Sequence, residues 1–232
     1  ADQLKVLSSN QVVALSTAQA AVLTSVQVAG LSPTQVSAIQ TEDLAAMNNS
    51  ALNKLNASQV KSLTTAQVVG LSTTQAAGLN KTFAAALTSA QLKAMETGDL
   101  AKLTTSAVQA LGNTALAGLT TAQVANLGTA QVAALSDVQI KQLSSANIQA
   151  LTSDQAKVLK QAQLGALTSA QVAAMDTVDL AQLNSAQIGA LSALGLAGLS
   201  TTQIAKLGTN QVAALTADQL KVSSSNKVVA LS

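Results

Sequence analysis

Three aspartates in this sequence combine a residue type and a spacing that could support chemistry. Asp43 lies in QTEDLAAM, Asp99 in ETGDLAKL and Asp179 in DTVDLAQL, at the same place in each stretch. Carboxylate oxygens are ligands that calcium accepts, so a calcium site is one interpretation. The other is structural: most equivalent stretches hold glutamine here, at a helix start where a carboxylate can serve the same cap. We favour the cap and expect neither a metal nor a cofactor.

Composition excludes most other chemistry. The 232 residues include no His, Cys, Trp, Tyr or Arg and one Phe, and 9% are charged. Nucleophile–base pairs, transition-metal sites and aromatic ligand cages cannot be built from this set, so we expect no enzyme and no catalytic residues. A net charge of +2 carried by lysine provides no basic field for nucleic acid, and no apolar run approaches the roughly 18 residues that cross a bilayer. The sequons beginning at Asn48, Asn56 and Asn80 are expected by chance in an Asn/Ser/Thr-rich chain.

The elements that must position these residues follow an eight-residue repeat. Stepping by eight from Leu7 reaches an apolar residue each time to Leu231, except at Ser223. With this residue as position one, the consensus octad is Leu-Ser/Thr-Thr/Ser-Ala-Gln-Val-Ala-Ala, and position six is aliphatic in every octad, from Leu4 to Val228. We therefore interpret residues 1–232 as one continuous octapeptide array, a segment of a longer chain.

The order of residues within the octad predicts a short helix. Position two is almost always Ser, Thr, Asn, Asp or Gly, the residues preferred at helix N-caps. Glutamine follows three residues later, as in Ser16 with Gln19 and Thr120 with Gln123, which is the capping-box spacing. Pro33 then falls at the first helical position, where proline is tolerated. We expect one helix of about one and a half to two turns per octad.

Charge and glycine placement support the same prediction. All ten acidic residues occupy positions two to five, and nine of the twelve lysines occupy positions seven and eight, as the helix dipole favours. Position eight, where each helix would end and glycine costs least, holds Gly30, Gly70, Gly78, Gly118 and Gly198. A β-solenoid is the alternative fold, because Val and Thr favour strands. A single continuous helix is disfavoured, because an octad advances about 80° beyond two turns and would spread the leucines around the helix.

Short helices need neighbours to be stable, so the expected fold is an all-α solenoid, a superhelix of short capped helices. Positions one and six would form its core, with Ser, Thr, Gln and Lys outside. Phe83 replaces glutamine at position five; we expect it to pack on a neighbouring octad, the alternative being that it marks a contact. Residues 1–16 return almost unchanged as 217–232, which suggests an array that continues in both directions or stacks end to end.

Two resemblances follow from these stretches. LTTAQVANL at Leu119 and LTSAQVAAM at Leu167 resemble the LTTAQVAAL-type octapeptide arrays of very large secreted or surface proteins of proteobacteria, often adhesin-like. The resemblance covers the whole chain and implies an extracellular or cell-surface location and a structural role. LSPTQVSAI at Leu31 is similar to the opening helix of transcription activator-like effector repeats. The similarity ends after nine residues, the second helix and base-reading loop are missing, and we expect no DNA binding.

These observations favour a structural, self-associating repeat module such as a stalk, filament or surface-layer component. Its partner would be another copy of the chain, bound end to end or laterally, and its mechanism would be packing and mass action. The alternative is a binding scaffold for an extended ligand or surface, such as a glycan or ice, that uses rows of Ser, Thr and Gln side chains.

Overall fold

The computed structural model describes residues 7–221. Residues 1–6 and 222–232, which include Leu4, Ser223 and Val228 and parts of the two matching end segments, lie outside the described part. The chain forms two compact units, Ala1–Leu119 and Thr120–Ser232. The all-α prediction is confirmed: residues 7–221 form 27 α-helices and contain no strand.

Every described helix is four to six residues long and begins at position three of an octad. The six-residue helices have the expected length of one and a half to two turns, and the four- and five-residue helices are shorter. The helices of the first unit are α2 (Ser9–Val13), α3 (Thr17–Ala21), α4 (Ser25–Ala29), α5 (Pro33–Ala38), α6 (Thr41–Ala46), α7 (Asn49–Leu52), α8 (Ala57–Ser62), α9 (Thr65–Val69), α10 (Thr73–Ala77), α11 (Lys81–Ala86), α12 (Ser89–Ala94), α13 (Thr97–Leu100), α14 (Thr105–Ala110) and α15 (Asn113–Leu116). The helices of the second unit are α16 (Thr121–Asn126), α17 (Thr129–Ala134), α18 (Asp137–Lys141), α19 (Ser145–Gln149), α20 (Ser153–Lys157), α21 (Gln161–Ala166), α22 (Ser169–Ala174), α23 (Thr177–Gln182), α24 (Ser185–Gly189), α25 (Ala193–Ala197), α26 (Thr201–Ala205), α27 (Thr209–Ala213) and α28 (Ala217–Lys221).

The predicted capping boxes form in most octads. In α3 the Gln19 backbone N–H donates to Ser16 Oγ at 3.3 Å, and the Ser16 N–H donates to Gln19 Oε1 at 2.8 Å. Thr120 and Gln123 make the same pair of bonds at the start of α16. Pro33 occupies the start of α5 after the Ser32 N-cap, as predicted, where its missing N–H has no helical acceptor. Each octad therefore restarts the helix with its own local hydrogen bonds.

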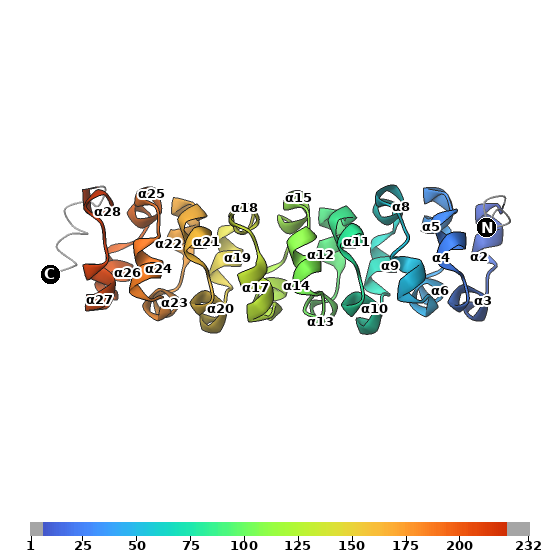
Figure 1. Cartoon of the computed structure of the whole chain (residues 1–232), viewed down its shortest axis with the longest axis horizontal. Helices are drawn as coiled ribbons and strands as arrows, with labels where there is room; N and C mark the ends of the chain where they lie inside the picture. The colour runs from blue at the N-terminus through green and yellow to red at the C-terminus, as the bar shows by residue number, and fades with distance from the viewer. Residues whose placement is uncertain (1–6, 222–232) are drawn as a thin grey trace. The chain divides into compact units, whose positions relative to one another are not determined.

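Within each unit, helices pack against helices three octads away, so they form rows (Figure 1). In the first unit α2, α5, α8, α11 and α14 pack successively, as do α3, α6, α9, α12 and α15. In the second unit the successive rows are α16, α19, α22, α25 and α28; α17, α20, α23 and α26; and α18, α21, α24 and α27. Three octads therefore complete most of one superhelical turn.

Position-five glutamines join one turn to the turn before it, a role that the octad pattern does not reveal. Gln67 Nε2 donates to the carbonyl oxygens of Ile39, 28 residues earlier, at 2.7 Å and of Val36, 31 residues earlier, at 2.9 Å. Gln163 repeats this in the second unit, with Leu135 at 2.8 Å and Val132 at 2.9 Å. The second acceptor lies in the fourth octad back, so one superhelical turn takes between three and four octads. We call this series of inter-turn bonds the glutamine ladder.

The core confirms positions one and six and corrects position five. From Leu23 to Leu199, every position-one side chain is at most 6% exposed, and the position-six residues between Val12 and Ile204 are at most 2% exposed. The prediction that glutamine lies outside is wrong, because Gln67 is 2% exposed and most position-five glutamines are equally buried. Burial of these amides is tolerated because both their oxygen and their nitrogen are hydrogen-bonded.

Glycine at position eight lies at helix ends as predicted, but the reason differs. None of the described glycines has a positive φ, so backbone freedom explains none of them. A Cβ added to Gly118 would lie 2.6 Å from the main-chain oxygen of Ser89, which is at position three, three octads earlier. Gly198 meets Ser169 in the same way. Glycine is needed here because two turns of the superhelix approach each other closely.

Candidate functional site

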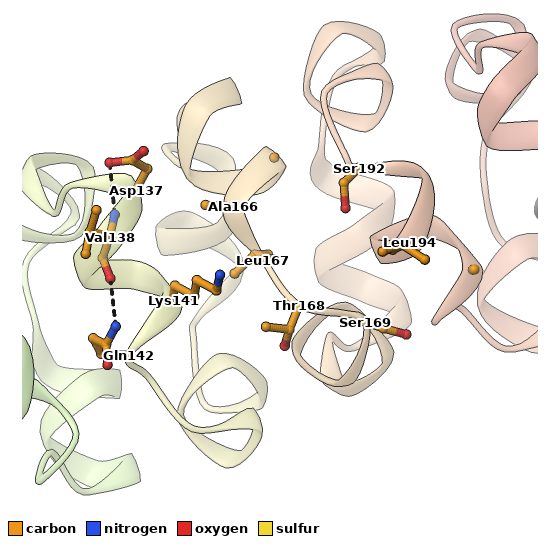
Figure 2. A pocket seen from close by; sticks show the side chains of 12 residues that line it. Asp137, Val138, Lys141, Gln142, Ala166, Leu167, Thr168, Ser169, Ser192 and Leu194 are labelled. Carbon is orange, nitrogen blue, oxygen red and sulfur yellow. Dashed lines mark hydrogen bonds between the residues drawn. The ribbon is translucent and has the colours of Figure 1, made fainter.

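A groove in the second unit lies between α18, α21, α22 and α25. It has a volume of about 800 Å³. Its lining residues are Asp137, Val138, Lys141, Gln142, Gly165, Ala166, Leu167, Thr168, Ser169, Ser192, Leu194 and Ala197. In Figure 2, the labelled residues of α18 lie on one side, Leu167 and Thr168 of the link after α21 lie in the middle, and Ser192 and Leu194 at the start of α25 lie on the other side.

The chemistry of this groove is mixed and weakly charged. Val138 and Leu194 are 50% and 75% exposed, so two large apolar side chains border it. Asp137 Oδ1 accepts the Val138 backbone N–H at 2.9 Å, so the carboxylate is hydrogen-bonded within the first turn of α18. Lys141 extends from α18 across the groove in the view of Figure 2. The groove can therefore hold an apolar or hydroxyl-rich chain segment beside one ammonium group.

A second groove in the first unit has the same register. It has a volume of about 540 Å³ and is lined by Ala57, Lys61, Lys81, Thr82, Ala85, Ala86 and Ala110. Lys61 and Ala86 here correspond to Lys141 and Ala166 in the larger groove, eighty residues further along in each case. Lys61 and Lys81 are its only charged lining residues, so this groove is electropositive. The two grooves therefore share an equivalent pair of helices, α8 with α11 and α18 with α21, and a lysine on the α8 or α18 wall.

The three aspartates singled out by the sequence occupy separate helices, α6, α13 and α23. Asp43, Asp99 and Asp179 are buried at 2%, 3% and 5% exposure. The capping interpretation is wrong for all three, since these described helices have neither a side-chain cap nor a capping box. Asp179 Oδ1 instead accepts the Ser153 hydroxyl of the preceding turn at 2.7 Å. The calcium interpretation gains no support, because residues 7–221 contain no group of three or more acidic, His or Cys side chains that could hold a metal.

The buried environment of Asp179 changes the pKa of its carboxyl. Burial raises the pKa of its carboxyl above the ordinary value of 3.8. The Ser153 hydroxyl opposes this by stabilising the carboxylate, and the nearby negative charge of Asp176 adds to the increase. The carboxyl lies in the ladder position rather than in either groove, so its perturbation bears on the stability of the array.

Phe83 is fully buried at 0% exposure, as the packing interpretation predicts. An asparagine pair takes over the bonding that glutamine supplies elsewhere. Asn80 donates its backbone N–H to Asn53 Oδ1 at 2.8 Å and its Nδ2 to the Asn53 carbonyl at 3.1 Å. Asn53 Nδ2 in turn donates to the Gly78 carbonyl at 2.8 Å. The turn at α11 therefore keeps its link to the preceding turn while an aromatic ring fills its core.

The three sequon asparagines are helix N-caps. The side-chain oxygens of Asn48, Asn56 and Asn80 accept backbone N–H groups at the starts of α7, α8 and α11. Capping accounts for asparagine at each position without a further role. Sequence reasoning missed both grooves. One signal was available: similar stretches recur eighty residues apart, as in LTSAQLKAM from Leu87 and LTSAQVAAM from Leu167, so a surface feature of one stretch can recur in the other.

Comparisons with known proteins address the repeat itself. No curated protein matches this chain. Within residues 7–221, none of the helices has the length and apolar character needed to cross a bilayer. The family model of the ALTTAQ repeat matches residues 1–33, 36–73, 92–129, 124–161, 158–193 and 195–222. The segment between the second and third matches contains the divergent Phe83 octad. Because these matches cover most of the octads, the chain belongs to the ALTTAQ repeat family.

Proposed function

We propose that this chain is a structural, self-associating module of a secreted or cell-surface protein, in which the octad array forms a stalk, filament or surface layer of the adhesin-like kind. The observation that carries the proposal is the glutamine ladder. A turn with position-five glutamines has one face of side-chain amide donors and one of main-chain carbonyl acceptors, so the faces of two such turns are complementary where they meet. Its mechanism is packing and hydrogen bonding, with no chemical step.

Two contact modes are available to a second copy. In the end-to-end mode, α2, α3 and α4 offer Gln11, Gln19 and Gln27, whose Oε1 atoms are engaged in capping boxes and whose side chains are less buried than the other position-five glutamines. In the lateral mode, exposed apolar side chains such as Val138 and Leu194 meet on a surface with few charges.

Sedimentation velocity and electron microscopy over a range of concentrations test the proposal. We expect association that increases with concentration, and elongated assemblies on the grid. If copies join end to end, the triple variant Gln11→Met, Gln19→Met, Gln27→Met should abolish the association. If they join laterally, the double variant Val138→Lys, Leu194→Lys should abolish it. A chain that stays monomeric up to its solubility limit would overturn the proposal. Antibody labelling of intact cells that make the protein tests the surface location, which labelling only after permeabilisation would exclude.

The paired grooves favour one second candidate, a scaffold for an extended ligand such as a glycan. Grooves repeated at equivalent helices suit a polymer with a repeating unit, and Lys61 and Lys81 favour an acidic one. Binding to an array of neutral and acidic glycans tests this candidate, with Lys61→Ala and Lys81→Ala expected to weaken binding to the acidic members. If the lysine variants and the unmodified chain bind acidic glycans equally, this groove is excluded as the glycan-binding site.

A further inference from the structure

Three successive octads of the first unit lack the donor that builds the glutamine ladder. Position five holds Asp99 in α13, Ala107 in α14 and Ala115 in α15, and all three are at most 3% exposed. An ionised carboxylate and a methyl group have no N–H to donate. Because a superhelical turn takes between three and four octads, almost a whole turn is without position-five donors.

The missing bonds can be located from the register of the intact ladder. Gln91 Nε2 donates to the Leu63 carbonyl, 28 residues earlier, at 2.7 Å, and Gln75 Nε2 donates to the Met47 carbonyl, also 28 residues earlier, at 2.8 Å. By the same spacing, the acceptors for residues 99, 107 and 115 would be the carbonyls of Leu71, Leu79 and Leu87. Position five therefore contributes no hydrogen bond between the turn of α10 to α12 and the turn of α13 to α15.

The helix starts in this turn are weak as well. The N-caps of α13 and α15 are Glu96 and Gly112, and neither makes a side-chain cap bond. Both helices are four residues long, the shortest in the described structure. Thr104 caps α14, but Ala107 cannot return the second bond of a capping box. Because a short helix depends on its caps and neighbours, these helices have little local stability of their own.

Another interruption of the ladder is bridged, which makes the contrast informative. Asp43 and Ala51 occupy position five in α6 and α7, yet amide side chains at position two of the same octads reach the preceding turn. Gln40 Nε2 donates to the Val13 carbonyl at 2.8 Å, and Asn48 Nδ2 donates to the carbonyls of Ala21 and Leu23 at 3.5 Å. Loss of the glutamine alone is thus compatible with side-chain links between turns.

We propose that the turn formed by α13, α14 and α15 is a soft joint, the place where the first unit opens locally before the rest of it unfolds. Three features coincide there: all three helices lack the ladder donor, α13 and α15 lack a side-chain cap, and α13 and α15 have the shortest helix length among the described residues. Local opening in a repeat array begins where the contacts between neighbouring repeats are weakest. The inference goes beyond the proposed function and concerns the intact chain whether or not it assembles.

Hydrogen exchange of the whole chain, followed by mass spectrometry, tests the joint. Backbone amides of α13 to α15 should exchange faster than those of α8 to α10 in the unmodified chain. Asp99→Asn and Ala115→Gln each supply a donor at position five. Asn147 shows that asparagine fits this position, since it is 2% exposed and makes a capping box with Ser144. Each variant should slow exchange in the joint by about three- to tenfold, which is the effect of one hydrogen bond.

Two further variants serve as controls. Thr114→Gln places a glutamine on the exposed side of α15, one residue from Ala115, and should leave exchange unchanged. Gln75→Met removes a ladder donor from α10 and should speed exchange there. Equal exchange of α13 to α15 and α8 to α10 in the unmodified chain would overturn the inference. The same conclusion would follow if neither Asp99→Asn nor Ala115→Gln slowed exchange more than Thr114→Gln.

Discussion

Replacing Gln67 by methionine measures what the glutamine ladder contributes to stability. Methionine fills the same space with an unbranched apolar chain but can neither accept nor donate the bonds made by the amide. The change removes the bond from the Thr64 N–H to Oε1 at 2.8 Å and the two bonds from Nε2 to Val36 and Ile39. At about 1 kcal/mol for each bond, and more where a buried partner is left unpaired, we expect a loss of about 2 to 4 kcal/mol.

Gln19 supplies the matched control. It forms the same capping box with Ser16, but its side chain is exposed and its Nε2 makes no ladder bond to the described residues. Gln19→Met therefore removes one bond and should lower the free energy of unfolding by about 1 kcal/mol. Urea denaturation followed by circular dichroism compares the two variants. If Gln67→Met and Gln19→Met destabilise the chain equally, the inter-turn bonds contribute nothing and the reasoning is refuted.

Gln67→Glu separates donation from acceptance at the same position. The introduced carboxylate can still accept the Thr64 N–H, but its second oxygen faces two carbonyl oxygens. Burial and this contact should raise the pKa of the introduced carboxyl above its ordinary value, so the folded chain would bind the proton more tightly than the unfolded chain. Stability should then rise as pH falls, because protonation restores an O–H donor. A pH-independent loss would contradict this account.

Three further outcomes are expected. Thr65→Pro, at the first position of α9, should change stability by less than about 1 kcal/mol, whereas Val69→Pro in the same helix should cost about 3 kcal/mol or more, as measured by urea denaturation. Gly118→Ala should lower the thermal midpoint because of its close approach to the preceding turn, whereas Gly98→Ala, with open space at its Cβ, should raise it slightly. The pKa of Asp179 is raised above 3.8, so the folded chain binds this proton more tightly than the unfolded chain, and stability should decrease as pH rises from the ordinary pKa through the raised one. Asp179→Asn should flatten this pH dependence in denaturation curves measured across acidic pH.

Local signals made most of the fold predictable. A cap and its box involve residues three positions apart, so Ser16 with Gln19 specifies its own helix start regardless of the remaining chain. Pro33 fixes the phase of the octad for the same reason, because the first helical position alone tolerates it. The eight-residue spacing of apolar residues then identified positions one and six as the core.

Features that depend on distant residues were not predictable from the octad. The sequence shows that Gln67 can close a capping box, but its burial depends on carbonyls 28 and 31 residues earlier. The partner of Gly118 lies three octads before it, and the larger groove requires helices from two rows, α18 and α21 from one and α22 and α25 from the other. Asp179 was misinterpreted because its hydroxyl partner, Ser153, is 26 residues away.

The sequence by itself thus determined where each helix starts and which side chains are apolar enough to be buried, since both depend on neighbours within one octad. Only the tertiary structure decided how many octads make a turn, and therefore which residues 24 to 31 positions apart meet. The physical reason is that octads of nearly identical sequence have no local preference among these pairings. Packing of the rows and closure of the glutamine ladder select one of them for the whole array.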